Sequence, residues 1–547
     1  MGKKMTEKRI KKLNRYAQKG RKYKKFVYNR FFTCGFLAFL QIAIWLIVLF
    51  VLERQAGFFA RVILYGLAAT FVLYLLNRPD SDSSAKAKWI VMILVTPVIG
   101  MSLFLLYGEG RPTVFMKRKY ETAKQENAKY HLQSAKTSER VEEGGRATAL
   151  SKYLLNEVNY PAFTDGEIEY YSTGKDLFEA MLEEAEKAKK FILMEYFILA
   201  GGKMWDRLRE VLLRKAQAGV KVYIIYDDFG SILHLPHDYD LYLEALHPNI
   251  KCMAFNHVIP VFAMRQNNRD HRKLFVIDNE VAFTGGLNVS DEYIGELIRF
   301  GDWKDSGVKV TGASAQTFTI MFFDLWNAFN PEKKVDLSEL LGDVKSSKQE
   351  LIEKQIASDK KHDGRENYFV QPFDDSPLDQ KSDGEFVYLD VINRASKYVY
   401  IFTPYLILPD ALRFALCSAA MRGVDVRIVT PSIPDKKIVF RMTRANYGVL
   451  MQHGVKIYEY TPGFIHSKSI VSDDQCAVVG SINFDYRSLY LHFENAVYFT
   501  DEKAVKAVRD DCEKTFEVSS IRTPENTKRT WVGRLVDAVL RFTDTVV

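Results

Sequence analysis

At 547 residues, with 47% hydrophobic and 26% charged side chains, the chain is long enough for two or more domains with separate cores. Of the formal net charge of +8, residues 1–30 carry +12, from thirteen Lys or Arg and one acid, so the rest carries −4. A basic tail on a mildly acidic body fits an anionic membrane surface better than a nucleic acid, and no nucleic-acid partner is expected. The five cysteines show no C-x-x-C spacing, which excludes a recognisable zinc or disulfide framework.

Three apolar runs follow the basic tail, at residues 31–52, 58–76 and 89–107. Each is near the ~20 residues that a helix needs to cross a bilayer, and they hold almost no ionisable group apart from Arg61. A cleaved signal peptide would have a shorter apolar core and would not be followed by two more runs. We predict three transmembrane helices, with buried core helices as the alternative.

The basic residues between these runs predict an orientation. With a cytoplasmic tail at residues 1–30, the inside segments hold sixteen Lys or Arg and the outside segments six. Three crossings then deliver the remaining chain to the outside, so we predict a multi-pass protein of the cell membrane with an extracytoplasmic body. The orientation reverses if the first two runs do not both cross.

Residues 108–150 are charged and helical in character, and we interpret them as a connector. After them, strand-like runs alternate with amphipathic helical stretches, which is typical of an α/β fold. One order, strand, helix, strand, occurs twice, and in both copies a glycine and a valine stand where the helix should end and the strand begin. The four strand-like runs are KFILMEYFIL (190–199), VKVYIIYDDFG (220–230), KYVYIFTPYLIL (397–408) and VDVRIVTPS (424–432).

This repeat predicts two similar α/β domains, at residues 151–342 and 367–525, separated by a polar linker at 343–366. Residues 526–547 form a predicted amphipathic helix. One of its faces collects four apolar residues, Trp531, Leu535, Val539 and Phe542. The helix either lies in the membrane interface or packs on the body, and the sequence leaves both open.

One eighteen-residue stretch is also repeated: HRKLFVIDNEVAFTGGLN (271–288) returns as HSKSIVSDDQCAVVGSIN (466–483). The two agree at seven positions, most of them polar or glycine, so shared hydrophobic patterning does not explain the match. The shared polar positions are His271 and His466, Lys273 and Lys468, Asp278 and Asp473, and Asn288 and Asn483.

Side chains two residues apart in a strand share a face, so each histidine emerges beside a lysine. A histidine next to an ammonium group combines a nucleophile or acid with an anion clamp. Phosphodiester exchange by a covalent route needs one group to attack phosphorus and another to protonate the leaving alcohol, which two copies would supply. Asp278 and Asp473 have the opposite parity and fall in hairpin turns, so we expect them to hold structure, although they belong to the motif.

The pattern H-x-K-x4-D-x6-G-[GS]-x-N, present twice, resembles the signature of the phospholipase D superfamily. Flanking segments such as MEYFIL, FTGGLNVSDEY, DWKDSGVKVTG and YTPGFIHSK resemble the bacterial cardiolipin synthases within it, and the likeness covers roughly residues 77–525. The resemblance implies two phospholipase D-like α/β/α domains that form a pseudo-twofold pair around one active site. Family members usually have two membrane spans, so the run at 31–52 is an addition.

The resemblance also implies roles for the motif residues. The predicted catalytic set is His271, Lys273, Asp278, His466, Lys468 and Asp473. Within it, His271 would form a phosphatidyl-histidine and His466 would act as general acid and then base. The substrate phosphate would be bound by the lysines and by Asn288, Asn483 and Ser481; the first motif has Gly286 in place of Ser481. Glu494 would orient a motif histidine. Asp305 is a further candidate for the orienting role, without a family motif behind it.

We therefore expect an integral membrane cardiolipin synthase that joins two phosphatidylglycerols, with anionic membrane lipids as its partners. No metal or other cofactor is expected, since His234, His237 and His257 have no Cys or acid at metal spacing. The alternatives are a phospholipase D-type hydrolase or nuclease, another phosphatidyltransferase, and a non-catalytic membrane organiser. The sequence leaves the second lipid substrate and the oligomeric state open.

Overall fold

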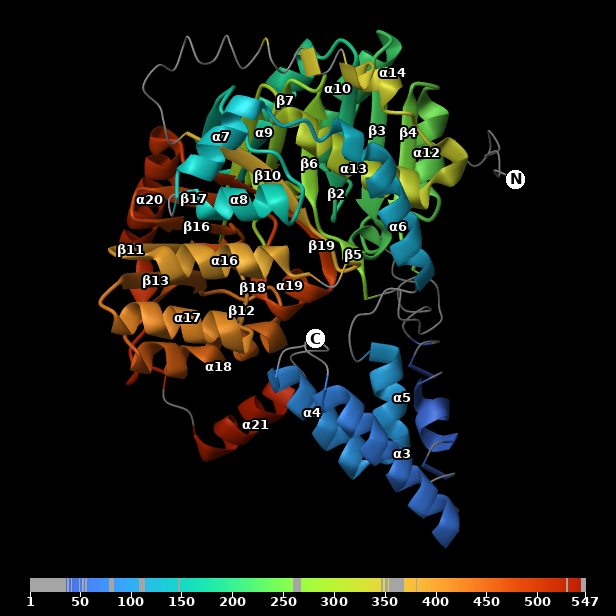
Figure 1. Cartoon of the computed structure of the whole chain (residues 1–547), viewed down its shortest axis with the longest axis vertical. Coiled ribbons are helices and arrows are strands. Elements are labelled where there is room, and N and C mark those ends of the chain that lie inside the picture. The colour runs from blue at the N-terminus through green and yellow to red at the C-terminus, as the bar shows by residue number, and fades with distance from the viewer. Residues whose placement is uncertain are drawn as a thin grey trace.

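The structure is a computed structural model (Figure 1). It describes residues 57–77, 83–107, 114–145, 148–258, 267–345, 368–379, 381–527 and 530–542, with scattered residues between 36 and 54 and between 348 and 353. The predicted basic tail lies outside the described residues, as does most of the predicted linker.

The second predicted membrane span forms a single helix, α3 (Phe58–Leu76), and its crossing of a membrane stays a prediction. Within the described residues, α3 is the one helix long and apolar enough to cross a membrane. Of the first predicted span, the described residues between 36 and 51 are helical, and the others lie outside the part that the structure describes.

The third predicted span, 89–107, is not one helix, and that prediction is wrong. The chain forms α4 (Ser83–Val95) and α5 (Pro97–Tyr107), with a break at Thr96. Pro97 has no N–H to donate to the preceding turn, and its ring disfavours helical backbone at the residue before it. The apolar composition of this run predicts affinity for a membrane but not its backbone conformation. The proline ends the first helix and begins the second.

The connector leads from α5 to the body through α6 (Val114–Asn127), α7 (Ala135–Glu143) and α8 (Ala149–Asn156). A seven-stranded sheet follows, as the alternating pattern predicts. Its strands in spatial order are β1 (Ile168–Tyr171), β9 (Gly307–Thr311), β7 (Val281–Gly285), β6 (Lys273–Ile277), β2 (Phe191–Tyr196), β3 (Lys221–Asp227) and β4 (Ile250–Phe255).

Helices cover both faces of this first sheet. Alternate residues of β2 show the two sides: Ile192 and Met194 join the core beneath α9 (Gly174–Lys187) and α10 (Lys203–Gln217), whereas Phe191 and Leu193 join the core beneath α13 (Ala315–Phe329). Shorter elements complete the unit: α11 (Asp228–Ser231), α12 (Tyr239–Leu246), β5 (Arg269–Asp270), β8 (Asp302–Lys304) and α14 (Ser338–Leu341).

The second sheet repeats the order of the first. Its main path is β10 (Val370–Asp375), β19 (His492–Phe499), β17 (Cys476–Gly480), β16 (Ser469–Ser472), β11 (Tyr398–Phe402), β13 (Asp425–Pro431), β14 (Lys456–Tyr460) and β20 (Ser519–Ile521). The helices of this unit are α16 (Asp383–Arg394), α17 (Asp410–Met421), α18 (Lys437–Gln452), α19 (Tyr486–Tyr490) and α20 (Glu502–Glu517). Three short strands, β12 (Leu406–Ile407), β15 (Gly463–Ile465) and β18 (Phe484–Asp485), lie beyond the strand ends.

The two units share one continuous hydrophobic core. It runs from α6 and α13 of the first unit through β10 into the second sheet. In Figure 1, α13 and β10 lie toward the centre of the body, between the outer helices of both units. The halves are therefore packed together along their length, which fixes the loops that bear the two histidine motifs.

The C-terminal helix is α21 (Trp531–Phe542), and residues 526 and 527, which the prediction included, lie in a turn before it. Arg441 of α18 holds it, with Nε 2.7 Å from Asp537 Oδ1 and a guanidinium N–H donated to the Gly533 carbonyl. Trp531 and Leu535 are exposed. One side of the helix therefore packs on the body and the apolar side faces outward, so its placement in a membrane interface stays a prediction.

Candidate active site

Two short strand pairings between the units build the site. β5 of the first unit pairs in parallel with the start of β19 of the second, and β15 of the second pairs in parallel with β8 of the first. Each pairing continues into a motif: the His271 backbone N–H donates to the Phe493 carbonyl (2.9 Å), and the His466 backbone N–H donates to the Lys304 carbonyl (2.7 Å). Each histidine is thus positioned by the backbone of the other unit.

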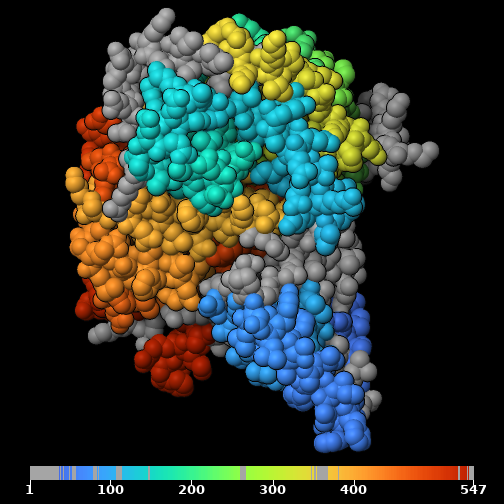
Figure 2. Space-filling model, viewed as in Figure 1, coloured from blue at the N-terminus to red at the C-terminus, as the bar shows by residue number. Residues whose placement is uncertain are grey.

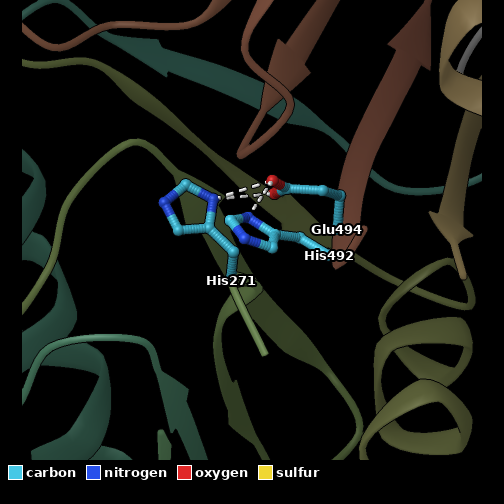
Figure 3. Close-up of side chains that lie close together, drawn as sticks. All are labelled: His271, His492 and Glu494. Atoms are coloured by element: carbon cyan, nitrogen blue, oxygen red, sulfur yellow. Dashed lines mark hydrogen bonds and ion pairs between the residues drawn. The ribbon is translucent and has the colours of Figure 1, made fainter. Parts of the chain in front are cut away.

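Each partner segment also supplies a carboxyl group: Glu494 lies on β19, and Asp305 follows directly after β8. Glu494 Oε1 and Oε2 lie 2.8 and 3.0 Å from His271 Nδ1, as Figure 3 shows. Asp305 Oδ2 lies 2.7 Å from His466 Nδ1. Because each Nδ1 faces its carboxylate, Nε2 lies on the opposite side of the ring, where a reacting atom can approach. Glu494 is where the sequence predicts an orienting group, and Asp305 occupies the equivalent position.

The two motifs face one another across a short distance. A Cβ atom added to Gly286 of the first motif would lie only 2.8 Å from the His466 carbonyl and 2.0 Å from Asp305 Oδ1. His466 and Lys468 are also among the groups that lower the pKa of His271. The structure therefore brings both histidines and both lysines into a single site.

The lysines are almost fully buried, with 1% of their surface exposed. Lys273 Nζ donates to the His271 carbonyl, and Lys468 Nζ donates to the His466 carbonyl and lies 2.9 Å from His466 Nδ1. Burial lowers the pKa of Lys273 to about 8 and that of Lys468 to about 7, with Lys273 contributing to the shift at Lys468. The positive charge of one lysine disfavours protonation of the other. A bound anion would oppose this effect and keep both lysines protonated, so the site favours an anionic ligand.

The histidines and Glu494 respond to the same environment. Burial, and then Lys468, lowers the pKa of His466 to about 4, and burial with Lys273 lowers the pKa of His271 well below its usual value. Burial raises the pKa of the Glu494 carboxyl to about 8. Near neutral pH both imidazoles are consequently uncharged, and a neutral imidazole is the form that can act as a nucleophile.

Asp278 and Asp473 lie in the turns of two equivalent hairpins, β6–β7 and β16–β17, with φ of 53° and 56°. The Asp278 carboxylate accepts the backbone N–H groups of residues 189–191 at 2.6–2.8 Å. The Asp473 carboxylate accepts those of residues 396–398 at 2.7–2.9 Å. Each aspartate therefore anchors the start of a neighbouring central strand, and the inclusion of both in the catalytic set is not supported by their positions.

The motif asparagines are engaged by the protein. Asn288 Oδ1 accepts the Ile198 N–H (3.1 Å), and its Nδ2 donates to the Tyr293 hydroxyl (2.8 Å). The Asn483 backbone N–H donates to the Ser488 hydroxyl (2.9 Å), while the buried Asn483 Oδ1 makes no hydrogen bond within the described residues. These contacts fit a role in shaping the loops beside the two histidines.

The sequence predicts that Ser481 binds the substrate phosphate, but in the structure its hydroxyl group is engaged within the protein. Its hydroxyl donates to Glu494 Oε2 (2.5 Å) and accepts the Asn495 N–H (2.9 Å). In the first motif Gly286 stands there, because the Asp305 carboxylate lies where a side chain would be. The Gly/Ser difference between the motifs thus accompanies the Asp/Glu difference between the two orienting acids.

Sequence reasoning missed His492 and Ser488. The His492 ring centroid lies 5.6 Å from that of His271, its Nδ1 lies 3.9 Å from Glu494 Oε1 (Figure 3), and Ser488 Oγ donates to the same oxygen. His492 stands two residues before Glu494 on β19, so strand parity was the signal that would have found it. Aromatic rings complete the walls, with Phe197 5.1 Å from His271, and Tyr293 and Trp303 5.3 and 5.6 Å from His466.

Among the described residues, one group has the composition of a metal site: His271, His492 and Glu494 offer ligand atoms within 4.8 Å of one another. Glu494 already accepts two serine hydroxyls, and Lys273 is a positive neighbour of both His271 and Glu494. A cation at this place would be repelled by that ammonium group and would displace His271 from its carboxylate. With the Lys273 ammonium group beside it, this site suits an anion better than a metal ion.

Comparison with known proteins agrees with this chemistry. The family model "Cardiolipin synthase, PLD-like domain" matches residues 181–297 and 388–516. An uncharacterized protein of Streptococcus mutans is 38% identical over 82% of this chain and 93% of its own. A cardiolipin synthase of Geobacillus kaustophilus is 30% identical over 88% of this chain and 92% of its own. The solved phosphatidylserine synthase of Haemophilus influenzae superposes with a TM-score of 0.53 at 14% identity, over 74% of this chain and 100% of its own, and so shares the fold.

Proposed function

This chain belongs to the cardiolipin synthases with phospholipase D-like domains, and from that premise we propose that it transfers a phosphatidyl group from one phosphatidylglycerol to another, releasing glycerol. The observation that carries the proposal is the paired arrangement of His271 with Glu494 and His466 with Asp305, each pair formed between the two units. Two equally supported histidines on one buried, lysine-lined site suit a double displacement at phosphorus.

In the first displacement, Nε2 of His271 attacks the phosphorus of the donor lipid and forms a P–N bond. The P–O bond to the headgroup glycerol breaks, and the leaving oxygen takes a proton from His466. Protonation of His466 is favoured once the substrate anion is bound, because negative charge opposes the effect of Lys468 on its pKa. Lys273 and Lys468 hold the non-bridging oxygens, and free glycerol departs.

In the second displacement, His466 is neutral and takes the proton from a headgroup hydroxyl of the acceptor phosphatidylglycerol. The hydroxyl oxygen attacks phosphorus, the P–N bond breaks, and its electron pair returns to His271. Cardiolipin is released and both imidazoles regain their starting states. Reactants and products contain the same kinds of bond, so the cycle needs no nucleotide and is reversible.

Transfer must compete with hydrolysis of the phosphatidyl-histidine. An oriented lipid hydroxyl has a large effective molarity, and bilayer attachment keeps acceptor headgroups at one depth beside the site. Attachment is supported by α3 and by the apolar run at 31–52, which make the protein a multi-pass membrane protein in this proposal. Anionic phospholipids are its partners, and buried walls around His271 and His466 keep bulk water from the intermediate.

The two units are also proposed to be a pseudo-twofold pair. Support comes from the matching sheet orders, the two equivalent strand pairings and the two histidine–carboxylate contacts. Such a relation explains why one active site requires both copies of the motif. It also makes the chemical roles of the two histidines interchangeable in geometry, so their assignment depends on experiment.

The test supplies purified full-length protein in phosphatidylglycerol vesicles with headgroup-labelled lipid and identifies every product. We expect cardiolipin and glycerol in equal amounts, no loss of turnover with a chelator, and cardiolipin breakdown when glycerol is in excess. His271→Ala should be inactive, whereas His453→Ala, at the end of α18, should match the unaltered protein. Phosphatidic acid as the main product would replace the synthase by a hydrolase.

A further inference from the structure

The two helices that replace the third predicted span fold back on one another. The ring centroids of Trp89 in α4 and Phe104 in α5 lie 5.4 Å apart at 82°. In one straight helix, residues fifteen positions apart would be separated by about 22 Å along the axis. Phe104 also packs on Phe71 of α3, with centroids 5.3 Å apart, so all three helices meet in one small core.

The tip of this hairpin has a sequence built for close approach. A Cβ on Gly100 would lie 2.6 Å from Ile93 Cα, so glycine is required where the legs meet. Pro97 supplies no N–H, and the Thr96 hydroxyl donates to the Met92 carbonyl (3.1 Å) within the disrupted turn.

The hairpin is apolar on its outside as well as in its core. Val91, Leu94, Val95 and Leu105 are exposed, Val95 at 70% and Leu105 at 59%. Such a surface is suited to lipid rather than water. The legs are short, however: 13 and 11 residues reach only about 20 and 17 Å, against a hydrocarbon thickness of about 30 Å.

We infer that α4 and α5 form a re-entrant hairpin, which enters the bilayer from one face and leaves by the same face. The start of α4 and the two-sheet body then lie on the same side of the membrane, while the start of α3 lies on the other. Figure 1 agrees, since α3 and α4 lie together below the body and α5 extends from them toward it. The expected extracytoplasmic body depended on residues 89–107 crossing as one helix.

The charges indicate which side this is. If residues 31–52 cross, the re-entrant arrangement puts the basic tail, residues 77–88 and residues 108–124 on one face, with 21 Lys or Arg in all, against Arg54 alone in residues 53–57. This contrast is far larger than the sixteen to six of three crossings. The basic face is normally cytoplasmic, so the re-entrant hairpin places the active site in the cytoplasm.

The position and exposed side of α21 agree with the membrane plane that the re-entrant hairpin implies. Its exposed apolar side contains Trp531, Val532 and Leu535, and the polar contacts with Arg441 are on the side toward the body. Figure 2 shows α21 below the body, on the side where the helices of the membrane region project. An amphipathic helix at this height would lie in the headgroup layer of the leaflet that the hairpin enters.

Cysteine labelling in whole cells tests the topology. In a Cys34→Ala background, where the four described cysteines are buried, single cysteines replace the exposed Gly57, Ser83 and Lys175. A membrane-impermeant maleimide should label Gly57→Cys in intact cells, and Ser83→Cys and Lys175→Cys only after permeabilisation. Labelling of Ser83→Cys and Lys175→Cys from opposite sides would overturn the re-entrant hairpin. Labelling of both from outside would keep the hairpin and overturn the cytoplasmic assignment.

Crosslinking tests the hairpin itself. Trp89→Cys with Phe104→Cys should form a crosslink in native membranes with a bifunctional thiol reagent that spans about 10 Å, because about 22 Å would separate the two positions in a straight helix. The matched pair Trp89→Cys with Leu105→Cys, whose second side chain faces outward, should form at least ten-fold less. Equal, low yields from both pairs would show a straight helix and overturn the inference, whatever the enzyme activity of either variant.

Discussion

His466 Nδ1 lies 2.7 Å from Asp305 Oδ2, although the two residues are 161 positions apart and belong to different units. The contact copies the one between His271 and Glu494, in which the histidine comes from the first unit and the acid from the second. An acid at Nδ1 fixes the ring orientation and the tautomer that presents Nε2 to the substrate.

We expect Asp305→Asn and Glu494→Gln each to lower kcat by at least about 100-fold, because an amide leaves the ring in place but does not stabilise the required protonation state. Steady-state kinetics in vesicles measures the loss, with phosphatidylglycerol KM as a check on binding. Glu210→Ala on the exposed face of α10 is the control and should keep full activity. If both amide variants retain kcat within two-fold, the acids have no orienting role.

The assignment of nucleophile and acid predicts where the intermediate is attached. Acid quenching during turnover should trap a phosphatidyl adduct on His271, identified by peptide mass spectrometry. The adduct should be absent from His271→Ala. An adduct recovered on His466 would exchange the two roles while leaving the shared site unchanged.

The lysines predict how substrate capture depends on pH. A lysine carries its charge below its pKa, and burial lowers the pKa of Lys468 to about 7 and of Lys273 to about 8. The value of kcat/KM should therefore fall as pH rises from 7 to 9, since the free enzyme loses the charges that attract phosphate. Lys468→Arg, charged throughout this range, should flatten the fall even if its maximum is lower. A constant kcat/KM up to pH 9 in the unaltered protein would contradict the role of the lysines.

The two motifs differ at one position, Gly286 in the first and Ser481 in the second, and we expect the two residues to tolerate substitution differently. Ser481→Ala removes a hydrogen bond to the buried Glu494 carboxyl group, worth about 0.5–1.5 kcal/mol, so kcat should fall roughly 2- to 10-fold. Gly286→Ser should be more damaging, because its side chain would meet Asp305 at 2.0 Å. Gly448→Ala in α18, where a Cβ meets nothing within 4 Å, is the control. Near-normal activity of Gly286→Ser would show that Asp305 can move without consequence.

Substitution of Asp278 should lower the stability of the protein rather than its catalytic rate, because this carboxylate accepts three backbone N–H groups. Asp278→Ala removes three charge-assisted hydrogen bonds and places alanine at φ 53°, so we expect the free energy of unfolding to fall by about 2–4 kcal/mol. The temperature of half-inactivation should drop, whereas kcat of the folded fraction below that temperature should stay near normal. The opposite result, full stability with lost kcat, would return Asp278 to the catalytic set.

The repeat made much of this arrangement predictable from the sequence. Equal offsets of His, Lys, Asp, Gly and Asn identify two copies of one loop-and-hairpin unit, and residues such as Asp278 that accept positive φ mark the turns. The alternation of apolar runs with helical stretches likewise identifies an α/β fold, although it leaves the order of the strands within each sheet open. These features depend on neighbours in the chain, and a sequence displays them directly.

Contacts between distant residues were harder to predict. The motif letters assign Asn288 to the phosphate, but they do not reveal that Ile198 and Tyr293 already use its amide. Hydropathy is equally high for a straight helix and a hairpin, so it predicts a span at 89–107, whereas Pro97 and Gly100 stand where the chain reverses. The pairing of Asp305 with His466 depends on how the units dock, which no local pattern encodes.

The two strand pairings between the units have a consequence for the cell during protein synthesis. His271 leaves the ribosome more than two hundred residues before Glu494 and the β19 carbonyl that receives its N–H. Until β19 has been translated, His271 has neither of these partners. The active site is therefore complete only when the second unit has been made and docked on the first, so the fold delays activity until most of the chain exists.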